Sequence, residues 1–307
     1  MSIKVLELFG GIGACSKALD NIGIDYQISD YVEIDKYAVK SFNAIHGTNF
    51  EPQDVTKWDK DITVDLIMHG SPCQDFSVAG KGAGGDKDSG TRSSLMYETL
   101  RIVEKLKPKY VIWENVKNLL SEKHRHNYFA YIDSMAKLGY KSFGRVLNAK
   151  DFGVPQNRER IYTVSIRERE REYEWPEPVP LERRLGDMLE ESVDEKYYLS
   201  EDRIKGIAKW EKRQKENGRG FRFEVKDEDS IGRTVTTSGD RPSSSNYVKV
   251  NRLGGLYDNG GRVHQAGSIY DAGGLSPTLS TMQGGNLEPM TVIARSEERR
   301  VGKECRS

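Results

Sequence analysis

Strand-like and helix-like segments alternate through the first half of the chain, and this alternation constrains the fold more than any other feature. The apolar runs with the length of buried strands cover residues 3–9, 26–32, 64–68, 110–113 and 161–166. Helical periodicity separates several of these runs, at residues 14–22, 37–46 and 93–107. Strands that alternate with helices of this length predict an α/β fold with a mostly parallel, doubly wound sheet. Ligands of such sheets bind at the carboxyl ends of the strands, where we expect the functional site.

Length and composition limit the class of protein, and 307 residues are enough for one large domain or two. The chain contains no apolar stretch of about 18 residues, which excludes a membrane-spanning helix. Its first residues, Met1 to Lys4, lead directly into a strand-like run and lack the pattern of a signal peptide. The cysteines cannot build a disulfide framework and have no metal-ligand spacing: Cys15, Cys73 and Cys305. We therefore expect a soluble, cytoplasmic protein without a metal ion.

The charge of the chain is balanced, with 47 Lys and Arg residues against 47 Asp and Glu residues. A net charge of zero argues against a chain that is held to nucleic acid by bulk charge. Any nucleic-acid-binding surface must therefore be a local basic face.

The composition changes after the last strand-like run. A charge-rich stretch, 168–174, precedes a proline-rich segment, 175–180, that has the character of an extended linker. From about residue 194 onward the chain is polar, rich in glycine and poor in long apolar runs. We expect a first domain over residues 1–190 and a smaller, loop-rich second domain over residues 191–294. A partly disordered tail is the alternative to the second domain.

The first strand-like run ends in a glycine-rich turn, Phe9-Gly10-Gly11-Ile12-Gly13, which precedes a helix. Such a turn lets a ligand approach the backbone closely. Glu33 follows Gly13 by 20 residues, at the end of the second run, where a carboxylate can hold ribose hydroxyls. Together these residues indicate an adenosine-containing cofactor. The full G-x-G-x-x-G spacing of a dinucleotide site is missing, and a tight turn without a ligand is the alternative.

Cys73 and Glu114 each follow a later strand-like run. Cys73 lies in Gly70-Ser71-Pro72-Cys73-Gln74, ahead of a glycine-rich loop, and a thiol at this place can act as a nucleophile. A buried, inert cysteine is the alternative. Glu114 follows four apolar residues, so its carboxyl group should be partly desolvated, which suits a general acid near neutral pH. Its alternative role is to cap the next helix.

Gln156, Arg158 and Arg160 alternate with other residues just before a strand-like run. A period of two places all three on one face of an extended chain. Both guanidinium groups could then converge on one carboxylate or phosphate, and a solvated basic edge is the alternative.

Taken together, these motifs resemble those of the DNA (cytosine-5)-methyltransferase family. The similarity follows the family's order from about residue 3 to residue 167, and its most specific parts are Pro72-Cys73-Gln74 and Glu114-Asn115-Val116. The resemblance implies a Rossmann-like, S-adenosylmethionine-dependent methyltransferase fold. The residues that it implies for the cofactor are Phe9, Gly10, Gly11, Ile12, Gly13, Glu33, Ile34, Asp54, Val55, Pro72 and Leu95.

The same resemblance gives several of these residues a role. Glu33 would hold the ribose, and Ile34 would pack on the adenine. Asp54 and Val55 would meet the edge of the adenine, and Leu95 would line the methionine end.

The resemblance also implies a reaction. The thiolate of Cys73 would add to C6 of cytosine, which raises the electron density at C5 for methyl transfer. Glu114 would stabilise the ring through N3, while Arg160 would orient Glu114. Arg158 would lie near the nucleophile and O2 of the base. Because C5 is inaccessible inside a duplex, the cytosine must be flipped out of the helix.

By resemblance, the second domain is a target-recognition domain that reads bases in the major groove. The DNA-binding residues expected from the resemblance and from residue type are Gln74, Ser77, Lys81, Arg92, Arg233 and Arg241. The expected partner is double-stranded DNA, and neither a membrane nor a metal is expected. We expect a monomeric enzyme of a restriction–modification system or an orphan or phage modification enzyme.

The end of the chain departs from the family pattern, because the Gly-Asn-Ser motif that completes the family's cofactor pocket does not occur. Residues 295–307 instead resemble the translation of a sequencing-adapter read-through. We therefore expect a truncated gene with a non-native tail over these residues. A genuine charged helix is the alternative.

The sequence is also compatible with other functions. An RNA cytosine-5 methyltransferase would use the same motifs, although the large glycine-rich second domain favours DNA. A truncated, inactive DNA-binding fragment is an alternative from another class, and the presence of Cys73, Glu114, Arg158 and Arg160 together argues against decay of the site. A nicotinamide-dependent dehydrogenase is a more distant alternative, because the dinucleotide spacing is missing.

Overall fold

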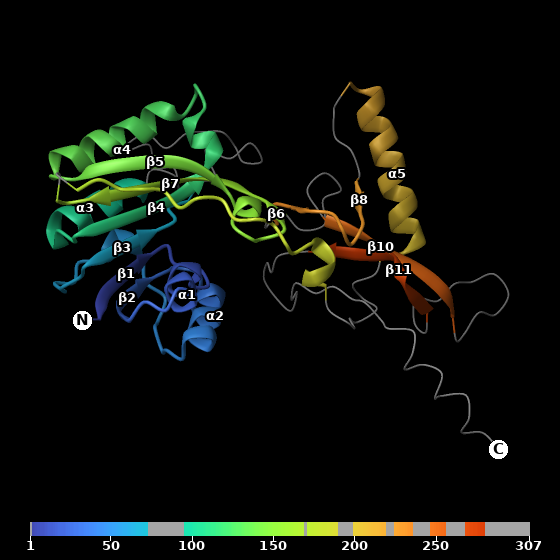
Figure 1. Ribbon diagram of the computed structural model, residues 1–307, viewed down its shortest axis with the longest axis horizontal. Coiled ribbons are helices and arrows are strands. Elements are labelled where there is room, and N and C mark those ends of the chain that lie inside the picture. The colour runs from blue at the N-terminus through green and yellow to red at the C-terminus, as the bar shows by residue number, and fades with distance from the viewer. Residues whose placement is uncertain are drawn as a thin grey trace, which may run out of the picture. The chain divides into compact units, whose positions relative to one another are not determined.

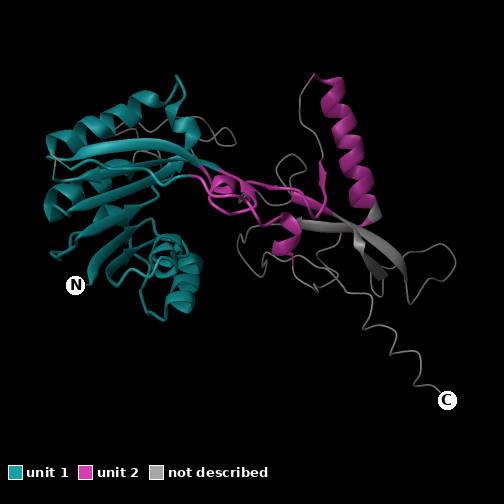
Figure 2. Cartoon of the chain, in the orientation of Figure 1, with its two compact units in different colours: residues 1–147, 159–177 teal, residues 148–158, 178–307 magenta. Residues whose placement is uncertain are grey.

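The computed structural model describes seven segments of the chain, and from residue 249 on it describes the backbone alone. These segments are residues 2–72, 95–168, 171–189, 199–218, 224–235, 246–255 and 268–279. The chain divides into two compact units (Figure 2). Unit 1 contains residues 1–147 and 159–177, and unit 2 contains residues 148–158 and 178–307.

Unit 1 is built on a six-stranded sheet with the order β2-β1-β3-β4-β7-β5 (Figure 1). Its strands are β1 (Ile3–Leu8), β2 (Tyr26–Val32), β3 (Leu66–His69), β4 (Tyr110–Val116), β5 (Lys141–Asn148) and β7 (Glu159–Ile166). Strand β1 pairs in parallel with β2 and β3, and β3 pairs in parallel with β4. Strand β7 is antiparallel to β4. The carboxyl ends of β1, β2, β3 and β4 therefore meet at one edge of the sheet.

The described part of unit 1 contains four α-helices, together with short 3₁₀ turns. They are α1 (Ala14–Asn21), α2 (Lys36–His46), α3 (Met96–Leu106) and α4 (Arg125–Lys137), and the turns include η1 (Val55–Lys57) and η3 (Lys117–Leu120). Helix α2 begins where the side chain of Asp35 accepts hydrogen bonds from the amides of Tyr37 and Ala38, and it ends at Gly47. Among the described residues, no helix is long and apolar enough to cross a membrane.

Apolar side chains of the sheet pack on both of its faces. Alternate residues of a strand point to opposite faces, and β1 shows this clearly. Val5 packs in a cluster with Leu19 of α1, while Leu6 and Leu8 belong to the main core. That core also contains buried side chains of α3 and α4, such as Ile102 and Tyr131. Helices therefore cover both faces, which confirms the predicted doubly wound sheet.

In the residues of unit 2 that the structure describes, there are short strands and one long helix. Its elements are η4 (Ala149–Asp151), β6 (Gln156–Asn157), η5 (Leu185–Met188), α5 (Glu201–Glu216), β8 (Val225–Lys226), β9 (Gly232–Arg233), β10 (Asn246–Gly255) and β11 (Ser268–Leu279). Strands β11, β10 and β8 form one sheet, and β6 and β9 form a second, two-stranded sheet. Ser200 caps the start of helix α5, since its hydroxyl accepts a hydrogen bond from the amide of Arg203.

Candidate active site

The glycine-rich turn connects β1 to α1 at the carboxyl edge of the sheet. Gly10 packs so closely on Tyr31 that a β-carbon at position 10 would lie 2.6 Å from a ring carbon. Gly13 has a φ of +86° at the start of α1, where a β-carbon would lie 2.7 Å from the ring of Phe42. Gly11 also has a positive φ, +55°, but a β-carbon there would meet no atom within 4 Å. Close packing therefore explains why positions 10 and 13 require glycine. The backbone at Gly11, in contrast, borders open space that a ligand could enter.

Glu33, directly after β2, contacts this turn. One carboxylate oxygen of Glu33, Oε2, accepts a hydrogen bond from the amide of Gly11 at 3.1 Å. The other, Oε1, accepts from the amide of Asp35 at 2.9 Å. The side chain of the neighbouring Ile34 is 69% exposed. The structure thus brings an oriented carboxylate and an exposed apolar side chain to the glycine-rich turn.

A second loop brings Asp54 and Val55 to the same strand end. The amide of Gln53 donates a hydrogen bond to the carbonyl of Glu33 at 2.8 Å, which ties the loop to the chain after β2. Asp54 caps the η1 turn, since its Oδ1 accepts hydrogen bonds from the amide and the hydroxyl of Thr56 at 3.0 and 2.8 Å. These hydrogen bonds lower the pKa of Asp54, so its carboxylate is an ionised acceptor at neutral pH.

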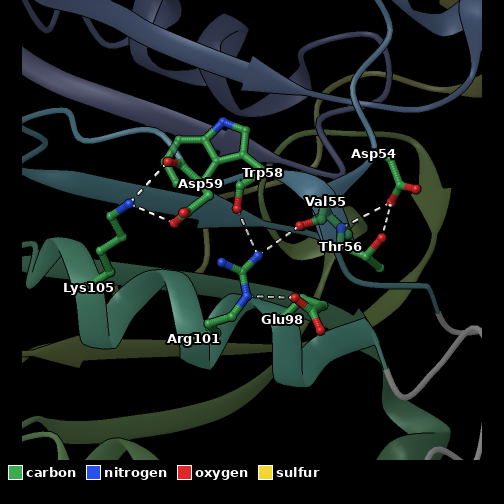
Figure 3. A network of polar contacts seen from close by, with 8 residues as sticks. All are labelled: Asp54, Val55, Thr56, Trp58, Asp59, Glu98, Arg101 and Lys105. Carbon is green, nitrogen blue, oxygen red and sulfur yellow. Dashed lines mark hydrogen bonds and ion pairs between the residues drawn. The ribbon is translucent and has the colours of Figure 1, made fainter.

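Arg101 of α3 holds this loop from the other side (Figure 3). One of its terminal nitrogens, Nη2, donates to the carbonyls of Val55 and Trp58 at 3.0 and 2.9 Å. Its Nε pairs with Glu98 of the same helix at 2.8 Å, which fixes the orientation of the guanidinium group. The arrangement of Asp54 therefore depends on a side chain that no part of the sequence pattern singled out.

The turn after β3 is anchored by β4. The indole N–H of Trp113 donates to the hydroxyl of Ser71 at 3.0 Å, and the amide of Asn115 donates to the carbonyl of Ser71 at 3.3 Å. All three side chains are buried. The parallel register of β3 and β4 places His69 opposite Trp113. The residues that follow His69 therefore lie beside the residues that follow Trp113. We call the hydrogen bonds of Ser71 with Trp113 and Asn115 the clamp on Ser71. Because Ser71 stands two positions before Cys73 in the sequence, this clamp holds the chain that leads into the proposed nucleophile.

A buried histidine packs behind this clamp. The ring of His69 stacks on that of Trp113 with 5.7 Å between their centroids, and its Nε2 lies 3.0 Å from the hydroxyl of Tyr131. Complete burial lowers the pKa of His69 to about 3. The imidazole is therefore neutral at physiological pH and serves the packing of the turn.

Glu114 and Arg160 form an ion pair across β4 and β7. Nε of Arg160 lies 2.9 Å from Oε1 of Glu114. The antiparallel register pairs Val116 with Arg160 and Glu114 with Tyr162, so both side chains arise near the end of β4. The second carboxylate oxygen of Glu114 lies 3.7 Å from the place of a β-carbon at Gly70. Glu114 therefore borders the Gly70–Pro72 turn.

Comparison with known proteins decides the family. The family model described as C-5 cytosine-specific DNA methylase matches residues 3–297, which is nearly the whole chain. The chain belongs to the C-5 cytosine-specific DNA methylase family.

Individual relatives agree with this membership. The chain is 32% identical over 330 residues to an orphan methyltransferase of Bacillus phage rho11s, covering 96% of this chain and 61% of the relative. It is 37% identical over 241 residues to an orphan methyltransferase of Bacillus phage SPR, covering 67% of this chain and 54% of the relative. The chain therefore spans a little over half the length of these two phage relatives.

Solved structures support the fold. A methyltransferase of Entamoeba histolytica, EhMeth, superimposes with a TM-score of 0.64 at 15% identity, covering 94% of this chain and 91% of that one. The Dnmt2 methyltransferase of S. pombe superimposes with a TM-score of 0.61 at 20% identity, covering 85% and 78%. The Rossmann-like methyltransferase fold expected from the motifs is thereby confirmed.

Part of the methylase site predicted from the motifs lies outside the described residues. The predicted residues concerned are Cys73, Gln74, Ser77, Lys81, Arg92 and Arg241. Pro72 and Leu95 are the described residues on either side of the gap at 73–94, and Leu95 packs against the main core at the start of α3.

The extended chain that carries Gln156, Arg158 and Arg160 is divided between two sheets. Gln156 lies in β6, which pairs with β9 in unit 2, whereas Arg160 lies in β7 of the main sheet. Arg158 stands between the two strands, and its amide donates to the side chain of Asn148 at 3.0 Å. The pairing of β6 with β9, far away in the sequence, interrupts the extended run. Only Arg160 therefore arises from the strand beside Glu114.

Arg233, a predicted DNA contact, lies in β9. Its guanidinium group pairs with Glu224, and its amide donates to the side chain of Asn246 at 2.6 Å. Within unit 2, Arg233 thus joins β9 to the residues beside β8 and β10.

Glu7 is a buried acidic residue beside the glycine-rich turn that the sequence reasoning missed. It lies inside β1 with 0% exposure, and its Oε1 accepts hydrogen bonds from the amide and the hydroxyl of Ser16 at the start of α1. Burial raises the pKa of Glu7, and the two hydrogen bonds from Ser16 oppose this effect. Its Oε2 is buried without a hydrogen-bond partner among the described residues, 3.1 Å from the place of a β-carbon at Gly10. Its position inside an apolar run concealed it, because acidic residues in such runs usually face solvent.

Proposed function

We propose that this chain is a DNA (cytosine-5)-methyltransferase that transfers a methyl group from S-adenosylmethionine to C5 of cytosine in double-stranded DNA. The observation that carries the proposal is the joint arrangement at one edge of the sheet. The Glu114–Arg160 pair borders the Gly70–Pro72 turn at this edge, and the open turn at Gly11 lies at the same edge with Glu33. Membership of the methylase family supports the same assignment.

The residues around Gly11 fit the cofactor. Open space at Gly11 leaves its backbone accessible, and the Glu33 carboxylate beside it is an acceptor for ribose hydroxyls. The exposed Ile34 side chain offers an apolar surface for the adenine. The ionised carboxylate of Asp54 is an acceptor for the exocyclic amine of the adenine. We assign the cofactor to these residues together with the turn Phe9–Gly13.

The remaining assignments come from the sequence motifs. Val55 completes the adenine edge, and Pro72 and Leu95 complete the methionine end. When bound, S-adenosylmethionine supplies the electrophilic methyl group of the reaction.

The covalent step belongs to Cys73. Its thiolate adds to C6 of the flipped-out cytosine, and the electron pair of the C5–C6 double bond becomes available at C5. C5 then takes the methyl group, with S-adenosylhomocysteine as the leaving group, and loses its proton to a base while the C6–sulfur bond breaks to return the thiolate. The clamp on Ser71 positions the chain that leads into Cys73 for this step.

Glu114 stabilises the ring during this addition. Arg160 holds Oε1 of Glu114 at 2.9 Å, and we assign the other oxygen, Oε2, as the atom that carries a proton towards N3 of the base. A hydrogen bond at N3 offsets the negative charge that develops on the ring when the thiolate adds. Arg160 acts through Glu114, whereas Arg158 is assigned to O2 of the base. Gln74, Ser77, Lys81, Arg92, Arg233 and Arg241 remain the proposed DNA contacts.

The test is transfer of a labelled methyl group. The chain is incubated with labelled S-adenosylmethionine and either duplex DNA or transfer RNA, and the nucleic acid is digested to nucleosides. Label in 5-methyldeoxycytidine from DNA supports the proposal. Label in RNA alone, or label in DNA on a base other than cytosine, contradicts it.

A further inference from the structure

The carboxylate of Asp30, inside β2, is buried and has hydrogen-bond donors on both of its oxygens. Oδ1 accepts hydrogen bonds from the amide of Tyr31 and from the side-chain amide of Gln53, each at 3.0 Å. Oδ2 accepts from the indole N–H of Trp58 at 2.7 Å, and Nζ of Lys60 lies 2.8 Å from the same oxygen. Each oxygen of this buried group therefore has two donors, which fix its orientation.

Asp30 is ionised at neutral pH despite its burial. Burial raises the pKa of this carboxyl group, but the hydrogen bonds from Lys60, Trp58 and Gln53 outweigh the burial, so the pKa of Asp30 lies below its usual value of 3.8. An ionised carboxylate accepts hydrogen bonds at both oxygens and donates none. All the donors around Asp30 therefore find an acceptor in this one side chain.

Two of these donors lie at the two ends of the segment that carries Asp54 and Val55. Gln53 directly precedes Asp54, and Trp58 follows the η1 turn directly. The hydrogen bonds from Gln53 and Trp58 both lead to the same carboxylate. Asp30 therefore ties both ends of this segment to β2.

The same strand leads into Glu33, which is assigned to the ribose of the cofactor. Glu33 follows Asp30 by three positions, and its carbonyl accepts a hydrogen bond from the amide of Gln53 at 2.8 Å. Because Asp30 and Glu33 belong to one continuous piece of chain, the contacts of Asp30 fix the position of Asp54 relative to Glu33. These two carboxylates are the ones assigned to the adenine and to the ribose.

We propose that Asp30 is a positioning residue that aims the carboxylate of Asp54 at the exocyclic amine of the cofactor's adenine, and so makes the site selective for adenosine. Asp30 acts through Gln53 and Trp58, without touching the cofactor itself. Because a hydrogen bond weakens steeply as its geometry departs from the optimum, a small displacement of Asp54 is enough to lose this selectivity. The inference rests on the proposed function, since it concerns the cofactor assigned there.

Asp30→Asn removes these ties with almost no change of shape. If the asparagine oxygen takes the place of Oδ1, its NH₂ group faces the two donors of Oδ2. If the amide is reversed, the NH₂ group faces the two donors of Oδ1. Gln53 is not free to turn its own amide around, since its Nε2 also donates to the carbonyl of Tyr31 at 2.7 Å. Each arrangement therefore leaves one end of the segment without its hydrogen bond to β2.

The test compares two ligands that differ on the base alone. Calorimetry measures the affinity of the full chain for S-adenosylhomocysteine and for S-inosylhomocysteine, in which a carbonyl oxygen replaces the exocyclic amine of adenine. A hydrogen bond to a charged group contributes about tenfold in affinity or more, so the wild type should prefer the adenosine ligand by at least this factor. Asp30→Asn should lower the preference to about threefold or less, because the hydrogen bond to Asp54 is then poorly aligned.

Two further variants separate positioning from stability. Trp58→Phe removes the indole donor and should also reduce the preference, and its effect should not add to that of Asp30→Asn, because both variants remove the same hydrogen bond. Lys60→Met removes the other donor of Oδ2. Because the Lys60 side chain is half-exposed and lies beyond the segment, this control should keep the preference within about twofold of the wild type.

The preference is a ratio of two affinities, so a loss of folded protein lowers both affinities together and leaves the ratio unchanged. A reduced ratio in Asp30→Asn and Trp58→Phe, with the wild-type ratio in Lys60→Met, supports the proposal. A wild-type ratio in Asp30→Asn overturns it, as does an equal fall of the ratio in Lys60→Met. Circular dichroism reports whether each variant is folded, and if Asp30→Asn does not fold, the ratio in Trp58→Phe decides in the same way.

The wild type separates this inference from the proposed function. A wild type that does not bind S-adenosylhomocysteine contradicts the proposed function, and the inference falls with it. A wild type that binds both ligands equally, or a preference that persists in Asp30→Asn, contradicts the inference alone. Methyl transfer to DNA would in that case still uphold the enzyme assignment.

Discussion

Replacing Ser71 with alanine should slow methyl transfer while cofactor binding stays unchanged. The substitution removes the hydroxyl that accepts the indole N–H of Trp113 at 3.0 Å and the side-chain amide of Asn115 at 3.4 Å, and it leaves the hydrogen bond from Asn115 to the Ser71 carbonyl in place. The chain leading to Cys73 would then be held by one of these three hydrogen bonds. Gly11 and Glu33, which are assigned to the cofactor, have no contact with Ser71 among the described hydrogen bonds.

The magnitude follows from burial. Trp113 is 1% exposed, so its N–H would be left without an acceptor in the core, at a cost of about 1–3 kcal/mol. If about 1.4 kcal/mol of this cost adds to the activation free energy of thiolate addition, the rate of that step falls about tenfold. We therefore expect about a tenfold lower single-turnover rate of methyl transfer, and the same dissociation constant for S-adenosylmethionine by calorimetry.

Ser165→Ala is the matched control. Ser165 is also buried, and its hydroxyl lies 2.8 Å from that of Ser142. The register pairs Ser165 with Val111, three residues before Glu114 on β4, so its loss should destabilise the sheet away from the site. The control should lose a similar free energy of unfolding but keep the methyl-transfer rate within about twofold. Equal rates for Ser71→Ala and Ser165→Ala, at equal folded fractions, would refute the role given to the clamp.

Further predictions concern the cofactor side of the sheet. Glu33→Gln should weaken S-adenosylmethionine binding about tenfold or more, because hydrogen bonds to a charged group contribute about 1.5–3 kcal/mol; calorimetry that finds an unchanged affinity would contradict the assignment. Arg101→Met should raise KM for the cofactor and leave kcat at saturation nearly unchanged, because only the loop that carries Asp54 loses its support; a fall in kcat alone would contradict this. For Glu7, burial raises the pKa above its usual value of 4.5, so the folded state binds more protons than the unfolded state, and stability falls as pH rises above about 4.5. As pH rises above about 4.5, the unfolding free energy of Glu7→Gln should therefore increase relative to that of the wild type. A difference in unfolding free energy that does not vary with pH would exclude this linkage.

Five of the six strands of the main sheet were predictable because each contains a short apolar run, whereas β5 was not predicted because none of its eight residues is fully buried and its sequence is mixed. The run at 26–32 coincides with β2, and the other four runs fall on β1, β3, β4 and β7 within a few residues. Helix α4 was missed because its buried side chains are not aliphatic. They are Asn127, Tyr128, Tyr131 and Met135, a set that gives little apolar periodicity.

Unit 2 was less predictable for a different reason. Its strands β6, β8 and β9 have two residues each, and β6 pairs with β9, about 75 positions away. Strands this short carry no periodic signal, and long-range pairing decides whether they form at all. Helix α5 was missed because, among its described side chains at 202–216, only Ile207 is fully buried.

Some features of the site could likewise be predicted from the sequence, whereas others could not. The meeting of Glu33 with the glycine-rich turn could be anticipated, because the ends of neighbouring parallel strands share one edge. The clamp on Ser71 could not be anticipated, since it depends on the register between β3 and β4. Likewise, the ion pair of Glu114 with Arg160 required the antiparallel pairing of β4 with β7.

Covalent trapping on DNA tests the proposed mechanism at its chemical step. A duplex that contains 5-fluorocytosine is incubated with the chain and S-adenosylmethionine, and the products are separated under denaturing conditions. Fluorine at C5 prevents the final elimination, so the enzyme should stay attached through Cys73, and Cys73→Ala should yield no adduct while it still binds DNA. An adduct that persists in Cys73→Ala, or methyl transfer by the wild type to ordinary duplex without any adduct on the fluorinated one, would contradict the mechanism.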